Sequence, residues 1–399
     1  MLDIMPFNGS VLQVIPALDA GGAERTTVEI ARALVAAGGK ALVASAGGRL
    51  EGEIEACGGR VFRMPVESKN PITIWRNGRR LADLIRAENV DLVHVRSRAP
   101  AWSTLWAAKA TGIKSVSTYH GHYGTASSAK RLYNSGLLRT DLVIANSEFT
   151  AKTIRESYEL ALLSLKIVPR GADLDHFNPV LVTADRVTAL TKAWRIDSVP
   201  DTVKLLAPGR LTAWKGQEDL VAALGILSGN SSPRSDSGKT GAGQYAKFQL
   251  VFCGDAQGRD AFEQTLRDKI RVCGVDSMTH IVGHCADMPA AYHWADAVIA
   301  PSRRPEAFGR VVVEAGAMSK PVIASNHGGG KETIIDQQTG VLIPPHNPDA
   351  LAKAIMGLAD DPAACDHMGL AARAHVTENY SIDAMCSSTL RAYQSLGQI

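Results

Sequence analysis

The chain has 399 residues, of which 45% are hydrophobic and 21% are charged. This length is too great for one ordinary hydrophobic core, so it predicts two domains, and the composition is that of a globular protein rather than a disordered one. The 43 basic and 40 acidic residues leave a net charge of +3, which is too small to favour nucleic acid as a partner.

The cysteines and the apolar segments limit the kind of protein further. The 6 cysteines are scattered and form no Cys-x2-Cys pair, so the sequence predicts reduced thiols rather than a zinc site or a disulfide framework. The first residues lack a basic region followed by a long apolar run, and no long uninterrupted apolar stretch occurs elsewhere. The expected location is the cytoplasm, and basic helical stretches described below also allow the inner face of the cytoplasmic membrane.

Short apolar runs alternate with helix-like stretches along the whole chain. In the first half a helix is expected over 24–37, and strands are expected over 11–16, 41–46, 61–65, 92–95, 115–119, 142–145 and 166–168. In the second half strands are expected over 204–207, 248–253, 280–282, 297–300, 322–324 and 341–343. This alternation predicts an α/β protein with two Rossmann-like, doubly wound parallel-sheet domains that face a deep interdomain cleft.

The predicted domain boundary follows a turn-rich segment at 171–179, which is interpreted as the linker. Residues 1–178 form the expected N-terminal domain, on the acceptor side. Residues 179–378 form the expected C-terminal domain, and a helix over about 379–399 is expected to pack back. The segment 229–243 is rich in Ser and Gly, so we expect a mobile surface insertion there.

Two features of the first half are candidates for ligand contact. Gly21 and Gly22 follow the first strand and open the first helix, where glycine lets a ligand approach the backbone and the helix N-terminus favours negative charge. The alternative is a tight turn, and the dinucleotide fingerprint G-x-G-x-x-G is absent. His120 ends a strand beside Gly121 and could face a sugar or an acceptor, although a structural histidine is an equal alternative; His122 is a weaker candidate.

Basic residues are concentrated in two helical stretches of the first half. Arg76, Arg79 and Arg80 share a helix face because their spacings are three and four residues, and Arg86 lies in the same stretch. A second group contains Lys130, Arg131 and Arg139. Such faces could lie on an anionic membrane or meet a phosphorylated acceptor, and a plain solvated helix face is the alternative.

In the second half, the segment 208–216 (PGRLTAWKG) follows a strand and precedes a helix. Arg210 and Lys215 would both project from this loop. A diphosphate in a partly dry site needs paired cations of this kind, because its charges cannot remain uncompensated there. The alternative is that both are solvated surface cations. Glu306 and Glu314, further along the same half, favour the ligand-binding interpretation.

Glu306 and Glu314 stand eight residues apart in the segment 305–315 (PEAFGRVVVEA), the first in a loop and the second in a helix-like run. Eight residues span at most about 12 Å at helical rise, close to the distance from sugar to ribose in a nucleotide-sugar. Backbone N–H groups near Gly309, at the helix start, would suit an anion. The glycines of 327–332 (HGGGKE) would let the backbone approach a sugar.

Together these motifs resemble the retaining glycosyltransferases of family 4, which have the GT-B fold, over residues 11 to about 372. The linker segment also resembles that family, and the insertion 229–243 is the clear departure. The resemblance implies that Glu306 contacts donor sugar hydroxyls, Glu314 holds the ribose and His120 lies against sugar and acceptor. It further implies that the donor's phosphates and sugar meet Gly21, Gly22, Arg210, Lys215, Ala307, Phe308, Gly309 and Arg310, with Glu306, His120, Arg210 and Lys215 nearest the chemistry.

The implied activity is a hexosyl transfer from a UDP- or GDP-sugar to an acceptor hydroxyl with retention at the anomeric carbon. The family needs no divalent metal, so no metal or other cofactor is expected. The expected partners are the nucleotide-sugar and a glycan or glycolipid acceptor, in lipopolysaccharide or other envelope polysaccharide synthesis. The alternatives are another nucleotide-sugar enzyme of the same fold, such as an epimerase or a glycan synthase, and a non-catalytic nucleotide-sugar binding protein.

Overall fold

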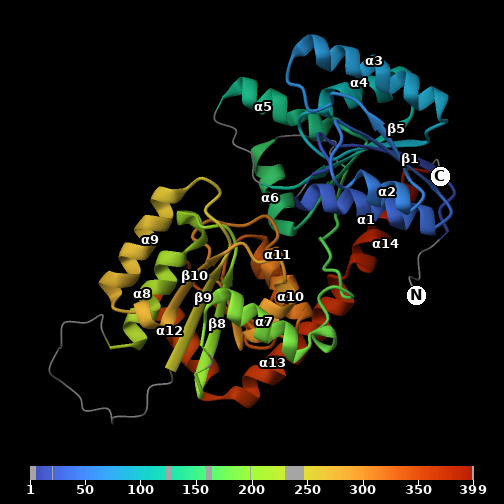
Figure 1. The fold of residues 1–399 in the computed structure, drawn as a ribbon. Helices are drawn as coiled ribbons and strands as arrows, with labels where there is room; N and C mark the ends of the chain where they lie inside the picture. Colours follow the sequence, from blue (N-terminus) through green and yellow to red (C-terminus); the bar gives the residue numbers. More distant parts are fainter. Residues whose placement is uncertain are drawn as a thin grey trace. The chain divides into compact units, whose positions relative to one another are not determined.

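A computed structural model describes residues 6–19, 21–121, 127–158, 164–197, 199–229 and 247–397. His122 and residues 230–243 of the predicted insertion therefore lie outside the described residues. The chain divides into two compact units, Met1–Gly171 with Ile382–Ile399 and Ala172–Ser381. Each unit is an α/β body built around its own parallel sheet (Figure 1).

The first unit contains a seven-stranded parallel sheet of order β3-β2-β1-β4-β5-β6-β7. Its strands are β1 (Ser10–Val14), β2 (Lys40–Ser45), β3 (Arg60–Arg63), β4 (Leu92–Val95), β5 (Lys114–Tyr119), β6 (Leu142–Ala145) and β7 (Leu165–Ile167). Its helices are α1 (Gly22–Ala36), α2 (Glu51–Ala56), α3 (Pro71–Ala87), α4 (Ala101–Thr111), α5 (Ser128–Ser135), α6 (Glu148–Ser157) and α14 (Ile382–Gln394), with a 3-10 turn η1 (Gly136–Arg139).

The five inner strands β1, β2, β4, β5 and β6 are buried on both faces, which explains why they are mostly uncharged and do not alternate between apolar and charged residues. Successive side chains of a strand point to opposite faces, so Val11 packs with α1, α2 and α14, while Leu12 packs with α3 and α4. The C-terminal helix α14 thus completes a face of the sheet formed by the start of the chain. Tyr393 of α14 is fully buried there, with its ring 6.1 Å from that of Phe7.

The second unit contains a six-stranded parallel sheet of order β10-β9-β8-β11-β12-β13. Its strands are β8 (Thr202–Pro208), β9 (Lys247–Cys253), β10 (Thr279–Gly283), β11 (Ala297–Ala300), β12 (Val322–Ser325) and β13 (Gly340–Ile343). Its helices are α7 (Ala184–Trp194), α8 (Gln217–Leu227), α9 (Asp260–Cys273), α10 (Met288–Trp294), α11 (Arg310–Ala317), α12 (Pro348–Asp360) and α13 (Pro362–Asn379), with 3-10 turns η2 (Pro179–Leu181), η3 (Ala213–Lys215), η4 (Asp276–Met278) and η5 (Gly329–Thr333).

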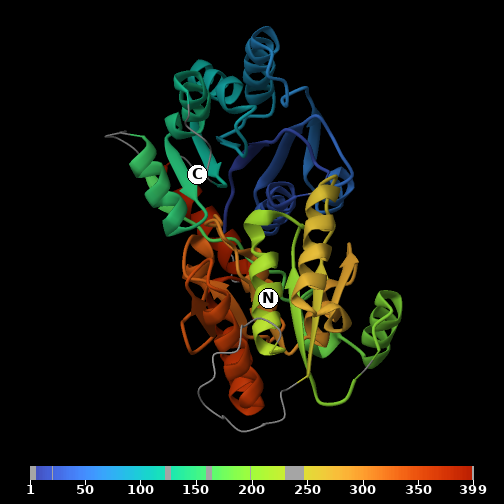
Figure 2. The ribbon, with the colours of Figure 1, turned by 90° about the vertical axis from the view of Figure 1, so that its left-hand side faces the viewer.

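Two apolar layers sandwich the second sheet as well. Leu205 belongs to the layer shared with α8, α9 and α12, and its neighbour Leu206 belongs to the layer shared with α10 and α11. The helices α8 and α9 lie side by side over one face, as both views show (Figures 1 and 2). The prediction of two doubly wound parallel-sheet domains is confirmed, and each predicted strand overlaps an observed one.

The boundary between the units lies at Gly171 and Ala172, seven residues before the predicted boundary at 178. The reason is that the segment after Gly171 makes its contacts with the second unit. The Ala172 N–H donates to the Tyr380 carbonyl at 2.7 Å, and Ala172 pairs with Ser381 in a short parallel bridge. Phe177 packs in the core of the second unit, with its ring 5.9 Å from that of Tyr292.

Candidate functional site

The loop that follows β8 is fixed to the end of the neighbouring strand β9. The Gly209 N–H donates to the Cys253 carbonyl at 2.8 Å, and the Leu211 N–H donates to the Asp255 carbonyl at 3.1 Å. Gly254 has a φ of 154°, and a Cβ there would overlap the Gly209 carbonyl, so only glycine permits this close approach. The loop that carries the predicted cations is therefore held at the carboxyl edge of the second sheet.

Lys215 and Glu306 are brought together at this edge. The Lys215 Nζ lies 2.8 Å from Glu306 Oε1, and the two side chains are 16% and 21% exposed. Ser302, which follows β11, donates its hydroxyl to the same carboxylate oxygen. The Lys215 ammonium also lies 4.8 Å from the centre of the Trp214 ring, a cation–π distance. The lysine therefore has a fixed position even though its chain is long.

The backbone around Glu306 is clamped by the glycine-rich segment after β12. The Glu306 carbonyl accepts the Gly329 N–H at 2.7 Å. Gly328 has a φ of 67°, and a Cβ on it would lie 2.7 Å from the backbone N and O of Glu306. His327 binds the Ser302 carbonyl through Nε2 at 2.7 Å, so the same segment also fixes the serine.

Arg210 is placed differently from Lys215. Its side chain is exposed, and within the part of the chain that the structure describes no hydrogen bond or ion pair of its guanidinium is found. Its backbone carbonyl accepts Gln217 Nε2 at 3.0 Å, which anchors the residue while the guanidinium stays outside the loop. The structure thus brings Lys215 to Glu306 and leaves Arg210 facing solvent.

Glu314 lies in α11 and is bound from two sides. The Tyr292 hydroxyl donates to its Oε2 at 3.0 Å, and Arg310 Nη2 donates to its Oε1 at 2.9 Å. Burial and the nearby Glu314 charge raise the pKa of Tyr292 well above its usual value, so the phenol stays protonated and remains a donor. The hydrogen-bonded carboxylate is therefore oriented by α10 and by its own helix.

The start of α11 is open to an acceptor of hydrogen bonds. Its N-cap residue Gly309 adopts a left-handed conformation with a φ of 84°, and no side chain caps the helix. Ala307 is partly buried, whereas Phe308 is only 5% exposed and packs in the apolar core of the unit. Phe308 can therefore contribute to a ligand site through its backbone, while its side chain belongs to the core.

In the first unit, Gly21 is the N-cap of α1. It has a φ of 152°, and a Cβ on it would overlap the Glu24 carboxylate. Gly22 is the first residue of the helix, and no side chain caps this end. The predicted position of the two glycines at a helix start is confirmed, but Glu24 folds back over Gly21.

His120 follows β5, and protein groups occupy both of its ring nitrogens. Its Nε2 lies 3.0 Å from the Arg96 carbonyl and its Nδ1 lies 2.9 Å from Arg170 Nη2. A carbonyl only accepts and a guanidinium only donates, so the ring is the neutral tautomer with its proton on Nε2. Burial, followed by the charges of Arg170 and Arg96, lowers the pKa of His120 well below its usual value.

A buried polar network lies behind His120. His94 binds Tyr393 of α14 at 2.6 Å and Thr118 at 2.7 Å, and Arg96 donates to Gln13 at 3.1 Å. Arg96 is 2% exposed, and burial lowers the pKa of its guanidinium. The network joins three strands of the sheet to the C-terminal helix, so its first role is to fix the carboxyl edge on which His120 sits.

The structure therefore assembles the predicted site residues in two groups, one in each unit. Ser302, Tyr292 and Arg170 contact these residues but were not predicted from the sequence. Ser302 lies in the same loop as Glu306, at a helix-like spacing of four residues, which is a weak signal that could have found it. Tyr292 and Arg170 carry no local signal, because their contacts depend on the packing of other elements.

Among the described residues, no group of three or more His, Cys, Asp or Glu side chains is arranged to hold a metal ion. No helix in the same residues combines the length and the apolar character needed to cross a bilayer.

Comparison with known proteins finds similarity in both units. Residues 20–176 match the sequence family described as Glycosyltransferase Family 4, and residues 191–375 match Glycosyl transferases group 1. A glycogen synthase of Mycobacterium tuberculosis is 30% identical over 320 residues, covering 77% of this chain and 69% of the relative.

Two solved structures extend this similarity to the fold. A glycosyltransferase of Rickettsia africae is 33% identical with a TM-score of 0.86, covering 98% of each chain. The Anabaena protein HepE, solved in complex with UDP, has a TM-score of 0.78 at 22% identity, covering 97% of this chain and 100% of HepE, which is a likeness of fold.

Proposed function

This chain belongs to glycosyltransferase family 4 and has the GT-B fold, and we propose that it moves a hexosyl group from a nucleoside-diphosphate sugar to an acceptor hydroxyl with retention at the anomeric carbon. The observation that carries the proposal is the cluster of Lys215, Glu306 and Ser302 at the carboxyl edge of the second sheet, where Arg210 of the same loop as Lys215 is exposed. Open α/β sheets bind ligands beyond this edge. A cation pair and an oriented carboxylate are what a diphosphate joined to a sugar requires.

In the proposed binding mode the donor spans the second unit from Glu306 to Glu314. Arg210 and Lys215 neutralise the diphosphate, aided by the uncapped start of α11. Glu306 accepts from sugar hydroxyls, and Glu314, already oriented by Tyr292 and Arg310, accepts from the ribose hydroxyls. We assign a UDP- or GDP-sugar as donor, and the HepE complex with UDP supports a uridine nucleotide.

The proposed reaction is a front-face substitution. The bond from the anomeric carbon to the phosphate oxygen breaks, the acceptor oxygen bonds to the same face, and the acceptor proton passes to the leaving phosphate. The diphosphate gains negative charge as the bond breaks, so Lys215 and Arg210 stabilise the transition state more than the ground state. In this scheme Glu306 stabilises positive charge that develops on the sugar. Because cationic side chains neutralise the phosphates, we further propose that the reaction needs no divalent metal, which assay in excess chelator tests.

The proposed acceptor is a glycolipid at an anionic membrane surface, and the surface of α3 and α4 supports this. Ile72, Trp75 and Trp106 are 62%, 52% and 44% exposed, and a hollow lined by Trp75, Arg79, Arg86 and Trp106 lies between the two helices. Arg76, Arg79, Arg80 and Arg86 are all exposed on α3. Exposed tryptophans beside arginines suit the interface of an anionic bilayer. We therefore favour envelope polysaccharide or lipopolysaccharide synthesis on the inner face of the cytoplasmic membrane.

Vesicle sedimentation tests the membrane part. Binding should require an anionic phospholipid, weaken with salt, and fall when Trp75 and Trp106 are both replaced by serine. A matched variant, Val272→Ser, changes an apolar residue that is 82% exposed in the second unit and should bind vesicles normally. Equal binding to neutral vesicles, or none to anionic ones, would remove the membrane from the proposal.

The enzymatic part is tested in two steps. Thermal unfolding with UDP, GDP and ADP identifies the base, because a ligand that binds only the native state raises the Tm with its occupancy. The sugar nucleotide of that base is then incubated with and without glycolipid or glycan acceptors, and NMR of the product gives the anomeric configuration. Product with inverted configuration would overturn the proposal. So would a protein that binds the nucleotide but catalyses neither transfer nor slow hydrolysis of the donor.

A glycan-extending synthase is the second candidate, because the glycogen synthase of Mycobacterium tuberculosis is a 30% identical relative. It would elongate an α-glucan primer and would not use glycolipids as acceptors. An epimerase would convert the donor without any acceptor. The product analysis separates these activities.

A further inference from the structure

The second unit contains a cavity that the proposed reaction does not use. It has a volume of about 500 Å³, within the usual range of small-molecule pockets of ~300–1,000 Å³. Thr202 to Leu205 of β8 and Ala297 of β11 line it, which places it at the amino ends of these strands. The candidate donor site lies at the carboxyl ends of the same strands, so the two sites occupy opposite edges of one sheet.

The inner wall of this cavity is aliphatic. It is formed by Leu205, Ala297, Ile323, Ile355 and Leu358, from three strands and from α12. These side chains also belong to the apolar core of the unit, which makes the wall continuous with a packed interior. No aromatic side chain is among the described residues that line the cavity, so this wall suits a flexible aliphatic group better than a stacked planar ring.

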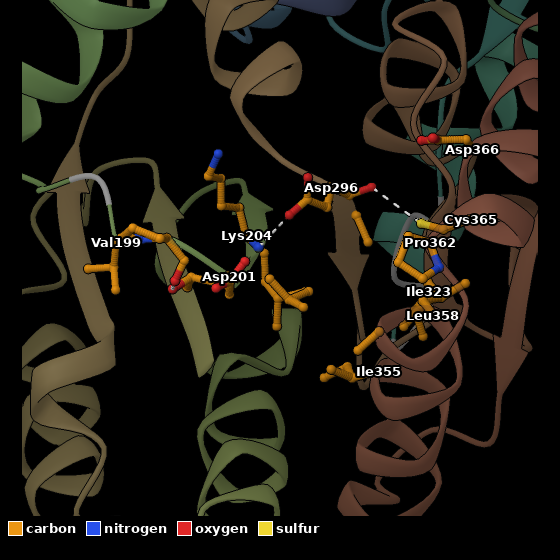
Figure 3. A pocket seen from close by; sticks show the side chains of 16 residues that line it. Val199, Asp201, Lys204, Asp296, Ile323, Ile355, Leu358, Pro362, Cys365 and Asp366 are labelled. Atoms are coloured by element: carbon orange, nitrogen blue, oxygen red, sulfur yellow. Dashed lines mark hydrogen bonds between the residues drawn. The ribbon is translucent and has the colours of Figure 1, made fainter. Parts of the chain in front are cut away.

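The mouth of the cavity is acidic. Asp201 and Asp296, which directly precede β8 and β11, and Asp366 of α13 line the cavity, and all three are labelled in Figure 3. Among the described lining residues, Lys204 carries the positive charge. Its ammonium points away from Ile355 in Figure 3. Asp296 is held in place because its Oδ2 accepts the Lys204 backbone N–H at 2.7 Å.

The negative charge at the mouth affects the pKa values of two nearby groups. Burial, together with Asp296 and Asp366, raises the pKa of the Cys365 thiol to about 11, so the thiol stays neutral. Burial lowers the pKa of Lys320, while the same two carboxylates act in the opposite direction. With Lys204 and Lys320 included, the carboxylates still outnumber the cations by three to two.

We propose that this cavity binds a small molecule with an aliphatic body and a terminal ammonium group. The aliphatic body lies against Val203, Leu358 and Ala359, which keep some exposed apolar surface in the cavity, and is removed from water there. The ammonium reaches Asp201, Asp296 and Asp366 at the mouth, where opposite charge favours it and would disfavour a carboxylate or a phosphate. This inference does not depend on the proposed transfer reaction.

A matched set of ligands tests the inference. Octylammonium, 1-octanol and octanoate have chains of equal length, and calorimetric titration of the full-length protein without nucleotide gives their Kd values. Octylammonium should bind saturably, and at least about tenfold more tightly than octanoate. Equal affinities, or no binding of octylammonium, would contradict the proposal.

Variants then locate the site. Ala359→Trp fills the cavity and should abolish binding, whereas Leu370→Trp, at a position 61% exposed on α13 and outside the cavity, should leave it intact. Asp201→Asn with Asp366→Asn should weaken octylammonium binding about tenfold and octanol binding little. Asp201 has a φ of 54°, which asparagine also tolerates, and Asp276→Asn is the control for charge.

Methyl NMR of the unmodified protein gives a measurement that does not depend on the folding of any variant. Octylammonium should shift the methyl resonances of Val203 and Leu358 in the unmodified protein. Shifts confined to other valines and leucines would place the ligand elsewhere and overturn the assignment.

Discussion

In the first unit both ring nitrogens of His120 are bound by Arg96 and Arg170, whereas in the second unit Lys215 and Glu306 bind each other at a partly exposed edge. The polar groups behind His120 are buried and are connected through His94 to Tyr393 of the C-terminal helix. Those of the second unit are charged and leave Arg210 exposed. The difference supports the proposal that the second unit binds the charged diphosphate of the donor.

The largest effect is expected at Lys215. Lys215→Ala removes the cation nearest Glu306 and should lower kcat by about 10²–10³, by analogy with the loss of one oxyanion donor. The control Lys353→Ala changes an exposed lysine of α12 and should leave kcat unchanged. Steady-state kinetics with the identified donor measure both, and near-normal turnover of the Lys215 variant would mean that the ion pair is structural.

Glu306→Gln tests the other member of the pair. The amide keeps the size of the side chain but loses the charge, so kcat should fall by about 10²-fold while nucleotide affinity changes less. If kcat is unchanged and KM for the donor rises, Glu306 contributes only to binding. Retention of the native Tm would show that the loop held by Gly328 and Gly329 is intact.

In the first unit the expected effect is a change of stability with pH, rather than a change of rate when a charged side chain is replaced. The folded-state pKa values of His94 and His120 lie below the unfolded value of about 6.5, since burial disfavours their charged forms. Their stabilising contribution is therefore complete above pH 6.5 and is lost as the pH falls. Each should reduce the free energy of unfolding by up to about 1.4 kcal/mol per pH unit below that value.

Urea unfolding between pH 7 and pH 5 measures this loss. His120→Asn should flatten the pH dependence, and His346→Asn, at an exposed histidine with a φ of 56°, should not. Identical slopes for the two variants would show that His120 titrates normally. Arg170→Met should raise the pKa of His120, because the positive charge of Arg170 helps to lower it.

The smallest effect is expected at Tyr292. Tyr292→Phe removes one hydrogen bond to Glu314, while Arg310 still holds the other oxygen. Nucleotide affinity should fall about three- to tenfold, corresponding to roughly 1 kcal/mol, with little change in kcat. Calorimetric titration measures the Kd, and a large loss of kcat would instead place Glu314 in the chemistry.

The sequence by itself determined the alternation of strands and helices and the positions of the polar residues that follow the strands. Short apolar runs are local signals, and so are the glycines at 21, 209 and 309, because each reflects the conformation of its own segment. These signals were sufficient for two parallel sheets and for the placement of Arg210, Lys215, Glu306 and Glu314 in one domain.

Only the tertiary structure decided which of these groups meet. Lys215 and Glu306 are 91 residues apart in the chain, and His94 and Tyr393 are 299 residues apart. The same holds for Tyr292 with Glu314, for Arg170 with His120, and for the cavity at the amino edge of the second sheet. Such contacts depend on how helices pack on the sheet, and residue spacing carries no direct information about that packing.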